Sequence, residues 1–194
     1  MGCDIHTYRE AFRGGQWVSV DEWVAYDYGE DEKGEEIPHK KQAYDGRNYD
    51  LFGVLAGVRQ RECTLMLTPR GIPFDVSEKV RCAHEKWDAD GHSHSYLYLH
   101  ELRALKSYIA DKTMPVGGLK EAEGWAKFKA SIDSGSPDWN LLYPYCQGSS
   151  DRTYVEFKLD IPMSFMIGEA VDKMINSFDD IEGDNHRLVF WFDN

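Results

Sequence analysis

The stretch DADGHSHSYL, residues 88–97, sets two carboxylates and two imidazoles around a single glycine. A loop of this composition, placed directly before a helical pattern, can hold polar groups rigidly and still expose them. Two histidines separated by one residue, with aspartates nearby, supply the nitrogen and oxygen ligands that divalent metals take. The stretch therefore predicts a metal or catalytic site. The alternative is a structural turn in which Ser93 or Ser95 caps the following helix.

Composition and charge limit the classes of protein to consider. The 194 residues are 42% hydrophobic and 13% aromatic, enough for one good core, so we expect a single domain over residues 1–194. The 22 basic and 34 acidic residues give a net charge of −12, which argues against a broad nucleic-acid surface or an anionic-membrane surface. We expect no membrane span and no signal peptide. The four cysteines are scattered without a C-x-x-C pair, which favours reduced thiols in a cytoplasm.

The first part of the chain predicts a β-hairpin and a capped helix. Alternation of apolar and polar residues indicates strands over residues 3–12 and 16–24, joined by a Gly-Gly turn. The acidic segment 27–43 has few core residues, so we expect it to be an exposed loop. Asn48 suits the N-cap of a helix that carries Asp50 in its first turn.

The remainder of the chain predicts several helices and then a strand–helix–strand order. Helical spacing and turn signals indicate, in chain order, helices over 75–87, 96–109 and 119–132, an aromatic loop over 138–150, a strand over 153–159, a helix over 164–178 and a strand over 187–192. Together with the N-terminal hairpin, this order predicts an α+β fold: an antiparallel sheet that includes the C-terminal strands and is packed by several helices.

Asp4 and His6 lie two residues apart in the first predicted strand, so their side chains share a face and can reach one ion. The alternative is an edge strand whose polar residues face water. Together with the aspartates and histidines of the 88–97 stretch, Asp4 and His6 give more candidate ligands than one metal ion needs. This number suits a two-metal centre that binds a phosphoryl group. The predicted zinc or manganese ligands are Asp4, His6, Asp88, His92 and His94, and the predicted catalytic residues are His92, His94 and Asp90.

Two arginines are predicted to bind an anion. Arg47 stands beside a predicted helix N-terminus, where a guanidinium and the helix dipole together favour phosphate or carboxylate. Arg70 lies in the stiff loop Pro69–Pro73. An equally weighted alternative for Arg47 is a surface ion pair with a neighbouring aspartate. Asn48 and Tyr96 complete the predicted substrate-binding set.

The other chemistries that we considered have weaker signals. Cys3 and Cys82 lack the surroundings of a catalytic thiol, and Ser93 lacks the strand–turn–helix elbow of a nucleophilic serine. The sequence holds no Walker A motif and no dinucleotide fingerprint. The remaining histidines are isolated in the sequence and are expected to be surface or capping residues; they are His39, His84, His100 and His186.

Two of these motifs resemble those of a known enzyme family. D-x-H at residues 4–6 and G-H-x-H at residues 91–94 resemble the first and last motifs of calcineurin-like metallophosphoesterases. The resemblance is one of ligands and does not extend to that fold. Only three residues precede Asp4, and the chain has GRNYD at 46–50 where the family has G-N-H-D or G-N-H-E.

A second resemblance covers most of the first hundred residues. MGCDIH at residues 1–6, GRNYDLF at 46–52, PRG at 69–71 with DVS at 75–77, and DGHSHS at 90–95 resemble motifs of uncharacterised phage and prophage proteins. This resemblance implies a viral origin and a host-cytoplasm setting. It implies no particular activity.

The sequence leaves three functions open. The leading expectation is a small metal-dependent hydrolase, similar to a phosphodiesterase, that acts on a phosphorylated small molecule such as a nucleotide or cyclic nucleotide signal. The second is a non-catalytic protein that sequesters such a signal, and the third is an acidic module that inhibits a host protein. A phage protein that counters host defence fits all three. If the N-terminal and central motifs form one site, Asp4 and His6 should lie near His92 or His94. Arg47 and Arg70, which would also serve the sequestering protein, should line one cleft.

Overall fold

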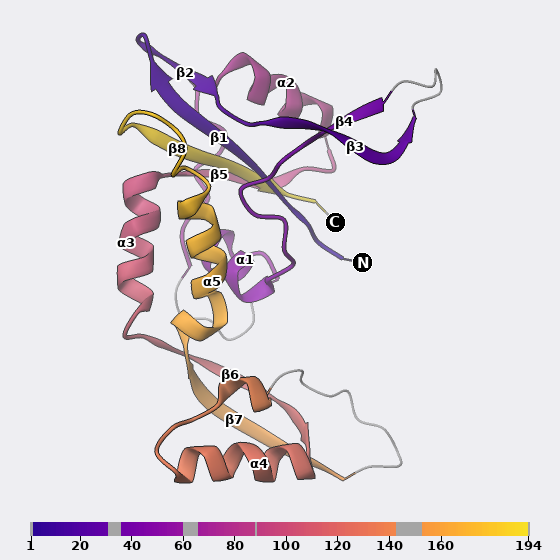
Figure 1. The fold of residues 1–194 in the computed structure, drawn as a ribbon, viewed down its shortest axis with the longest axis vertical. Coiled ribbons are helices and arrows are strands. Elements are labelled where there is room, and N and C mark those ends of the chain that lie inside the picture. Colours follow the sequence, from indigo (N-terminus) through magenta and orange to yellow (C-terminus); the bar gives the residue numbers. More distant parts are fainter. Residues whose placement is uncertain (1, 31–35, 60–65, 88, 143–152, 194) are drawn as a thin grey trace.

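The computed structural model describes residues 2–30, 36–59, 66–87, 89–142 and 153–193, which form an α+β fold (Figure 1). Its main sheet has four strands in the order β2-β1-β8-β5, and all neighbouring strands are antiparallel. These strands are β1 (Ile5–Arg13), β2 (Gln16–Ser19), β5 (His92–Tyr98) and β8 (His186–Phe192). The predicted α+β class is confirmed, and the N-terminal hairpin and the last strand share this antiparallel sheet, but the strand predicted over 153–159 does not join it.

Strand β8 lies inside this sheet, between β1 and β5. All seven of its residues, HRLVFWF, are buried. A run that is apolar on both sides of a strand needs a packed layer on each face of the sheet. The pairing of Ile5 with Phe192 also brings the two ends of the chain side by side, as Figure 1 shows.

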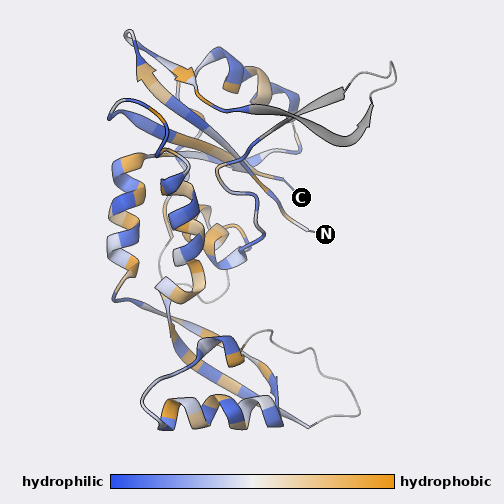
Figure 2. Cartoon of the chain, viewed as in Figure 1, coloured by the Kyte–Doolittle hydropathy of each residue, from blue (hydrophilic) through white to orange (hydrophobic). Residues whose placement is uncertain are grey.

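Three helices cover one face of the sheet: α1 (Tyr49–Ala56), α3 (Leu99–Ile109) and α5 (Met163–Asn176). Figure 2 shows hydrophobic residues alternating with hydrophilic ones along α3 and α5, as expected for helices with one buried side. Helix α1 begins as predicted, because the Asn48 side chain accepts a hydrogen bond from the Leu51 amide at 3.0 Å. It ends at Gly57, whose φ of 69° suits a left-handed C-cap.

Helix α2 (Glu78–Trp87) covers the opposite face, which we call the α2 face. Val80 of this helix packs with Tyr8 and with Val189 and Trp191 of β8 in a second, smaller core. Burial raises the pKa of the Tyr8 hydroxyl to about 12. The sheet is therefore the middle layer of three.

A buried ion pair holds one end of the α2 face together. The Arg187 Nε donates to Glu10 at 2.7 Å, and its Nη1 donates to Asp75 at 2.8 Å. The arginine is 1% exposed and Glu10 0% exposed, and the guanidinium lies 4.0 Å from the centre of the Trp17 ring. The other Glu10 oxygen accepts from the Ser77 amide at 2.7 Å, just before α2 begins. This network ties β1, β8 and the start of α2 to one point.

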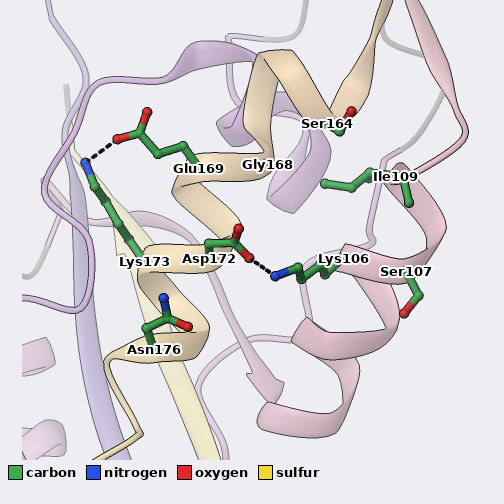
Figure 3. A pocket seen from close by; sticks show the side chains of 10 residues that line it. Lys106, Ser107, Ile109, Ser164, Gly168, Glu169, Asp172, Lys173 and Asn176 are labelled. Atoms are coloured by element: carbon green, nitrogen blue, oxygen red, sulfur yellow. Dashed lines mark ion pairs between the residues drawn. The ribbon is translucent and has the colours of Figure 1, made fainter.

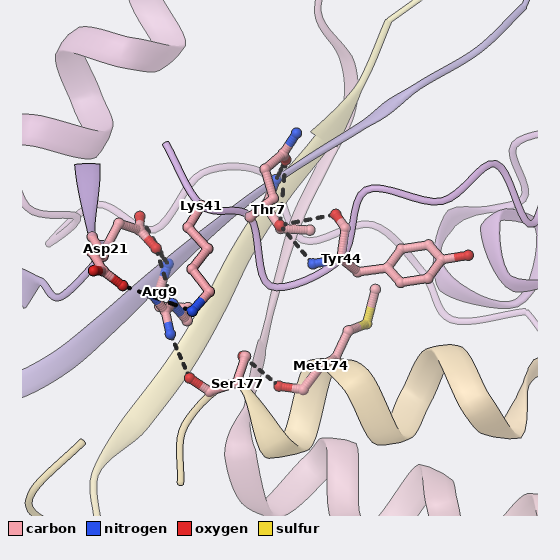
Figure 4. A network of polar contacts seen from close by, with 9 residues as sticks. Thr7, Arg9, Asp21, Lys41, Tyr44, Met174 and Ser177 are labelled. Carbon is pink, nitrogen blue, oxygen red and sulfur yellow. Dashed lines mark hydrogen bonds and ion pairs between the residues drawn. The ribbon is translucent and has the colours of Figure 1, made fainter. Parts of the chain in front are cut away.

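A second polar network joins β1 to the three-helix layer (Figure 4). The Arg9 guanidinium donates to the Ser177 carbonyl at the C-terminal end of α5, and to Asp21 at 3.1 Å. A cation at a helix C-terminus is favourable because the helix dipole is negative there. Next along β1, the Thr7 hydroxyl and the backbone of Tyr44 exchange hydrogen bonds at 3.3 Å. These contacts fix the connection before α1.

A smaller lobe projects from the α3 and α5 end of the molecule (Figure 1). It consists of the antiparallel pair β6 (Thr113–Glu121) and β7 (Tyr154–Pro162), with α4 (Ala122–Asp133) and the short 3₁₀ helix η1 (Trp139–Leu142). Phe128 is fully buried between these elements, and Trp125 stacks on Phe157 with ring centres 5.7 Å apart.

The structure differs from the sequence prediction in several segments, among them the strand expected over 16–24, which is divided between two strands. Within the segment 27–43, which was expected to be a loop, residues 27–30 belong to β3 (Trp23–Glu30) and residues 36–40 to β4 (Glu36–Lys40), and these two strands pair. The helix expected over 119–132 begins only at Ala122, because the preceding residues extend β6. The loop expected before α3 is instead largely strand β5, which pairs with β8. Most of the aromatic loop 138–150 lies outside the described residues.

Removing the buried cation should destabilise the fold strongly. Arg187→Met leaves the Glu10 carboxylate buried without a counter-charge, so the free energy of unfolding should fall by about 3–5 kcal/mol. The double variant Glu10→Leu/Arg187→Met should recover much of this loss, as urea unfolding would show. Lys127→Met is the control, because it breaks an exposed pair with Glu123 and should leave the melting temperature nearly unchanged. Equal losses in Arg187→Met and Lys127→Met would contradict the role of the buried pair.

Candidate functional site

Three histidines gather around Trp191 at the other end of the α2 face. The rings of His6 and His94 lie 6.2 and 5.9 Å from the Trp191 ring, one on β1 and the other on β5. His84 of α2 lies 4.6 Å from His94 and 5.7 Å from Trp191, between ring centres. Trp87, one helical turn after His84, packs on His6 at 4.0 Å. We call His6, His84 and His94, with Trp87 and Trp191, the imidazole cluster.

A β-bulge at Ser93 separates the two histidines of the H-x-H motif. His92 pairs with Phe192 and Ser95 with Phe190, so three steps along β5 match two along β8. Ser93 absorbs the extra residue with a φ of 51°, in the left-handed region. As a result, His92 stacks near Phe192 and His94 lies near Trp191. Phe192 and Trp191 are consecutive residues of β8, so their side chains point to opposite faces of the sheet. His92 and His94 therefore lie on opposite faces as well.

His94 has an unused ring nitrogen. Its Nε2 is buried and has no hydrogen-bond partner among the described residues, and the same holds for the Trp191 Nε1. Burial, followed by the neighbouring His84 and His92, lowers the pKa of His94, so its imidazole stays neutral below the usual range. Both unpaired nitrogens lie beside Gly91: a Cβ placed there would be 3.2 Å from the His94 Nε2 and 3.4 Å from the Trp191 Cδ1.

His6 is held by a carboxylate. Its Nε2 lies 3.1 Å from one oxygen of Asp193, and the other oxygen of Asp193 accepts from the Asp4 amide at 2.9 Å. Asp4 itself faces Arg47, whose Nη2 donates to it at 2.7 Å and whose Nε makes a second bond to the other carboxylate oxygen. This guanidinium lowers the pKa of the Asp4 carboxyl. His6 and Asp4 therefore already have protein partners.

The structure does not bring the described predicted metal ligands together around one point. Asp4 and His6 are engaged by Arg47 and Asp193, His92 and His94 turn to opposite faces, and Asp88 lies outside the described residues. His6 and His94 share the α2 face, but Trp191 stands between them. Within the described part of the chain, no group of three or more His, Cys, Asp or Glu side chains is placed to hold one metal ion.

The sequence prediction missed His84, which was expected to be isolated. Its relation to Trp87, three residues later on an amphipathic helix, was the available signal, since such pairs share a helix face. The sequence does not show that this face of α2 packs over the ends of β5 and β8, which is what brings His84 to His94.

The predicted anion-binding residues are held by acidic and backbone groups. Arg70 makes two bonds to Glu101, at 2.7 and 2.8 Å, and lies over the ring of Tyr96 at 5.3 Å. Asn48 uses its oxygen for the α1 cap and its nitrogen for the Met166 carbonyl at 2.8 Å. Asp90 is exposed in the turn between α2 and β5. The two arginines therefore meet different carboxylates, Arg47 at the end of β1 and Arg70 beside β5.

The loop that carries Arg70 has a structural role. The Arg70 amide donates to the Ser95 hydroxyl at 3.2 Å, and the Gly71 amide donates to the His94 carbonyl at 2.9 Å. These bonds cover the outer edge of β5, which would otherwise be open to another strand.

A groove lies elsewhere, between α3 and α5 (Figure 3). It has a volume of about 710 Å³, and small residues, including Gly168, are among those that line it. Its charged side chains are already paired: Lys173 lies 2.9 Å from Glu169, and Lys106 contacts Asp172. The imidazole cluster and this groove are on opposite faces of the sheet.

Comparisons with known proteins found no match to this chain among family models, curated proteins or solved structures. None of the helices in the described ranges is long and apolar enough to cross a membrane.

Glycine should replace the bulged serine without harm. Ser93 adopts a φ that costs a side-chain-bearing residue about 1–2 kcal/mol, so Ser93→Gly should keep the free energy of unfolding within about 1 kcal/mol of wild type. Ser93→Val should lower it by about 2 kcal/mol or more, because a β-branched residue avoids this region. Urea unfolding of both variants measures the difference. A valine variant as stable as the glycine variant would contradict the bulge.

The Arg70–Glu101 pair should give the protein part of its resistance to acid. The hydrogen bond from Arg70, and to a smaller extent that from the Tyr98 amide, lowers the pKa of Glu101 below its usual value of 4.5. A lowered folded-state pKa means that the pair stabilises the fold above about pH 4.5 and that this contribution is lost as the pH falls through the folded-state pKa. Between about pH 5 and pH 3, Glu101→Gln should therefore lose less stability than wild type. The exposed Glu85→Gln variant is the control, and identical pH profiles of Glu101→Gln and wild type would contradict the prediction.

Proposed function

We propose that the protein is a small metal-dependent hydrolase and that its reaction takes place at the imidazole cluster. The observation that carries this proposal is the unpaired, buried Nε2 of His94. A buried polar atom without a partner costs about 1–3 kcal/mol, and such atoms in native proteins usually serve a ligand, an ion or a water. Because its pKa is lowered, His94 presents the neutral imidazole that metal binding requires.

His6 is the proposed acid–base residue. When its Nε2–H donates to Asp193, the other ring nitrogen carries the lone pair and can accept a proton from an attacking water. Asp193 fixes the ring and stabilises the imidazolium that forms, as an orienting carboxylate does in other hydrolases. Trp87 and Trp191 pack against the ring and limit its movement.

The proposed substrates are phosphoesters of small molecules, with a nucleotide or cyclic nucleotide signal as the leading class. A protein with a net charge of −12 needs local positive charge to accept a phosphate, and Arg47 and Arg70 are already neutralised by Asp4 and Glu101. A divalent ion, when bound, supplies this charge and lowers the pKa of a bound water. The proposed setting is the host cytoplasm, in keeping with the resemblance to phage proteins.

Turnover of a defined panel of substrates tests this proposal. Tag-free protein would be incubated with linear and cyclic dinucleotides, with zinc, with manganese and with EDTA, and the products separated after heating. We expect shortened or linearised product that EDTA removes, and a kcat lower by about 10²–10⁴-fold in His6→Gln. His100→Gln is the matched control, because His100 is exposed and lies outside the cluster.

The other outcomes of this assay identify the alternatives. Stoichiometric release of intact nucleotide, with or without EDTA, would replace the hydrolase with a sequestering protein. If no member of the panel is bound or converted, the hydrolase proposal fails for these substrates, and an acidic module that inhibits a host protein becomes the hypothesis to test. Full activity in His6→Gln would exclude the proposed acid–base role.

A further inference from the structure

We infer that His84 and His94 form a two-imidazole site for a late first-row transition metal: cobalt, nickel, copper or zinc. This inference rests on the proposed function in one respect: the ion would be the metal of the proposed hydrolase. Ion binding itself is tested without any substrate. His84 belongs to none of the ligand motifs that the sequence suggested, so the inference assigns a ligand that only the packing of α2 against the sheet reveals.

The spacing of the two rings suits a shared ion. With metal–nitrogen bonds of about 2.0–2.1 Å and tetrahedral angles, two imidazoles on one ion have ring centres roughly 5 Å apart. The centres of His84 and His94 lie 4.6 Å apart, and the rings are inclined at 74°. His84 comes from α2 and His94 from β5, so two layers of the molecule hold the pair in place.

The space beside the His94 Nε2 is kept open by a glycine. A Cβ at Gly91 would lie 3.2 Å from that nitrogen and 3.2 Å from the Trp87 Cβ, closer than most real contacts. Any other residue at this position would therefore crowd the lone pair that a metal needs. The φ of Gly91 is not in the positive range, so turn geometry does not require glycine here. Glycine therefore allows the close packing of Trp87 and Trp191 here and leaves space beside the His94 Nε2.

The donor set selects the class of metal. Asp4 is bound to Arg47 and Asp193 to His6, so these two carboxylates are already engaged. Two imidazole nitrogens favour zinc, copper, nickel and cobalt over manganese, magnesium and calcium. The remaining coordination positions would hold water, as open positions do in catalytic sites. Of the two ions that the sequence suggested, this arrangement favours zinc.

Metal binding to tag-free wild type and matched variants tests the site. Competition with a chromophoric chelator would measure the dissociation constants of Mn²⁺, Co²⁺, Ni²⁺ and Zn²⁺ in a reduced, metal-stripped sample. We expect one equivalent to bind, with affinity rising from manganese through cobalt to nickel. His84→Gln and His94→Gln should each weaken binding at least about tenfold, and Gly91→Ala should do so while keeping both imidazoles. His100→Gln, on the neighbouring α3, should bind as wild type does.

A second measurement uses the wild-type protein and so does not depend on whether the variants fold. The electron paramagnetic resonance spectrum of the wild-type protein with one equivalent of Cu²⁺ should show coupling to two imidazole nitrogens. Selective ¹⁵N-histidine labelling would identify them. Absence of this coupling, or an affinity for nickel that His84→Gln and Gly91→Ala leave unchanged, would overturn the inference.

The two proposals fail separately. One equivalent of metal at His84 and His94 without turnover would retain the metal site and reject the hydrolase. Metal-dependent turnover that survives in His84→Gln would retain the hydrolase and place its ion elsewhere.

Discussion

The structure depends on the burial of β8 from both sides. Seven consecutive buried residues cannot be covered by one layer, so α1, α3 and α5 pack on one face while α2 and the smaller core pack on the other. The Glu10–Arg187–Asp75 network fixes one end of the α2 face, and the imidazole cluster occupies the opposite end. Because α2 is attached at its start by this network, the position of His84 over His94 follows from the same constraint.

The Ser93 bulge decides which histidines can act together. In a regular strand His92 and His94 would lie on the same face, whereas the extra residue turns His92 towards Phe192 and leaves His94 beside Trp191. His94 then meets His84 from another layer in place of its neighbour in the sequence. Non-glycine residues in the left-handed region are often retained at functional sites, which agrees with the proposed role of this end of the sheet.

Much of the fold could be predicted because its signals are local. Alternation in the first strands, the Asn48 cap and the apolar run of β8 all act within a few residues, and the structure confirms them. The 88–97 stretch was expected to be largely a loop because its polar residues concealed a strand that pairs only with β8, almost a hundred residues away. The partners of Arg47 and Arg70 were equally hidden, since ion pairs between distant segments leave no periodic pattern. Residues of the site could be named individually, but their grouping depends on a bulge and a helix position that the sequence does not encode locally.

Anomalous diffraction from crystals of the zinc-loaded protein would show whether His84 and His94 hold one metal ion. Data collected on either side of the zinc absorption edge locate the ion without assumptions about its ligands. We expect one peak between His84 and His94, within about 2.0–2.1 Å of a nitrogen of each ring and beside Gly91. A peak at His6 and Asp4, a peak at surface histidines alone, or no peak in zinc-saturated crystals would contradict it.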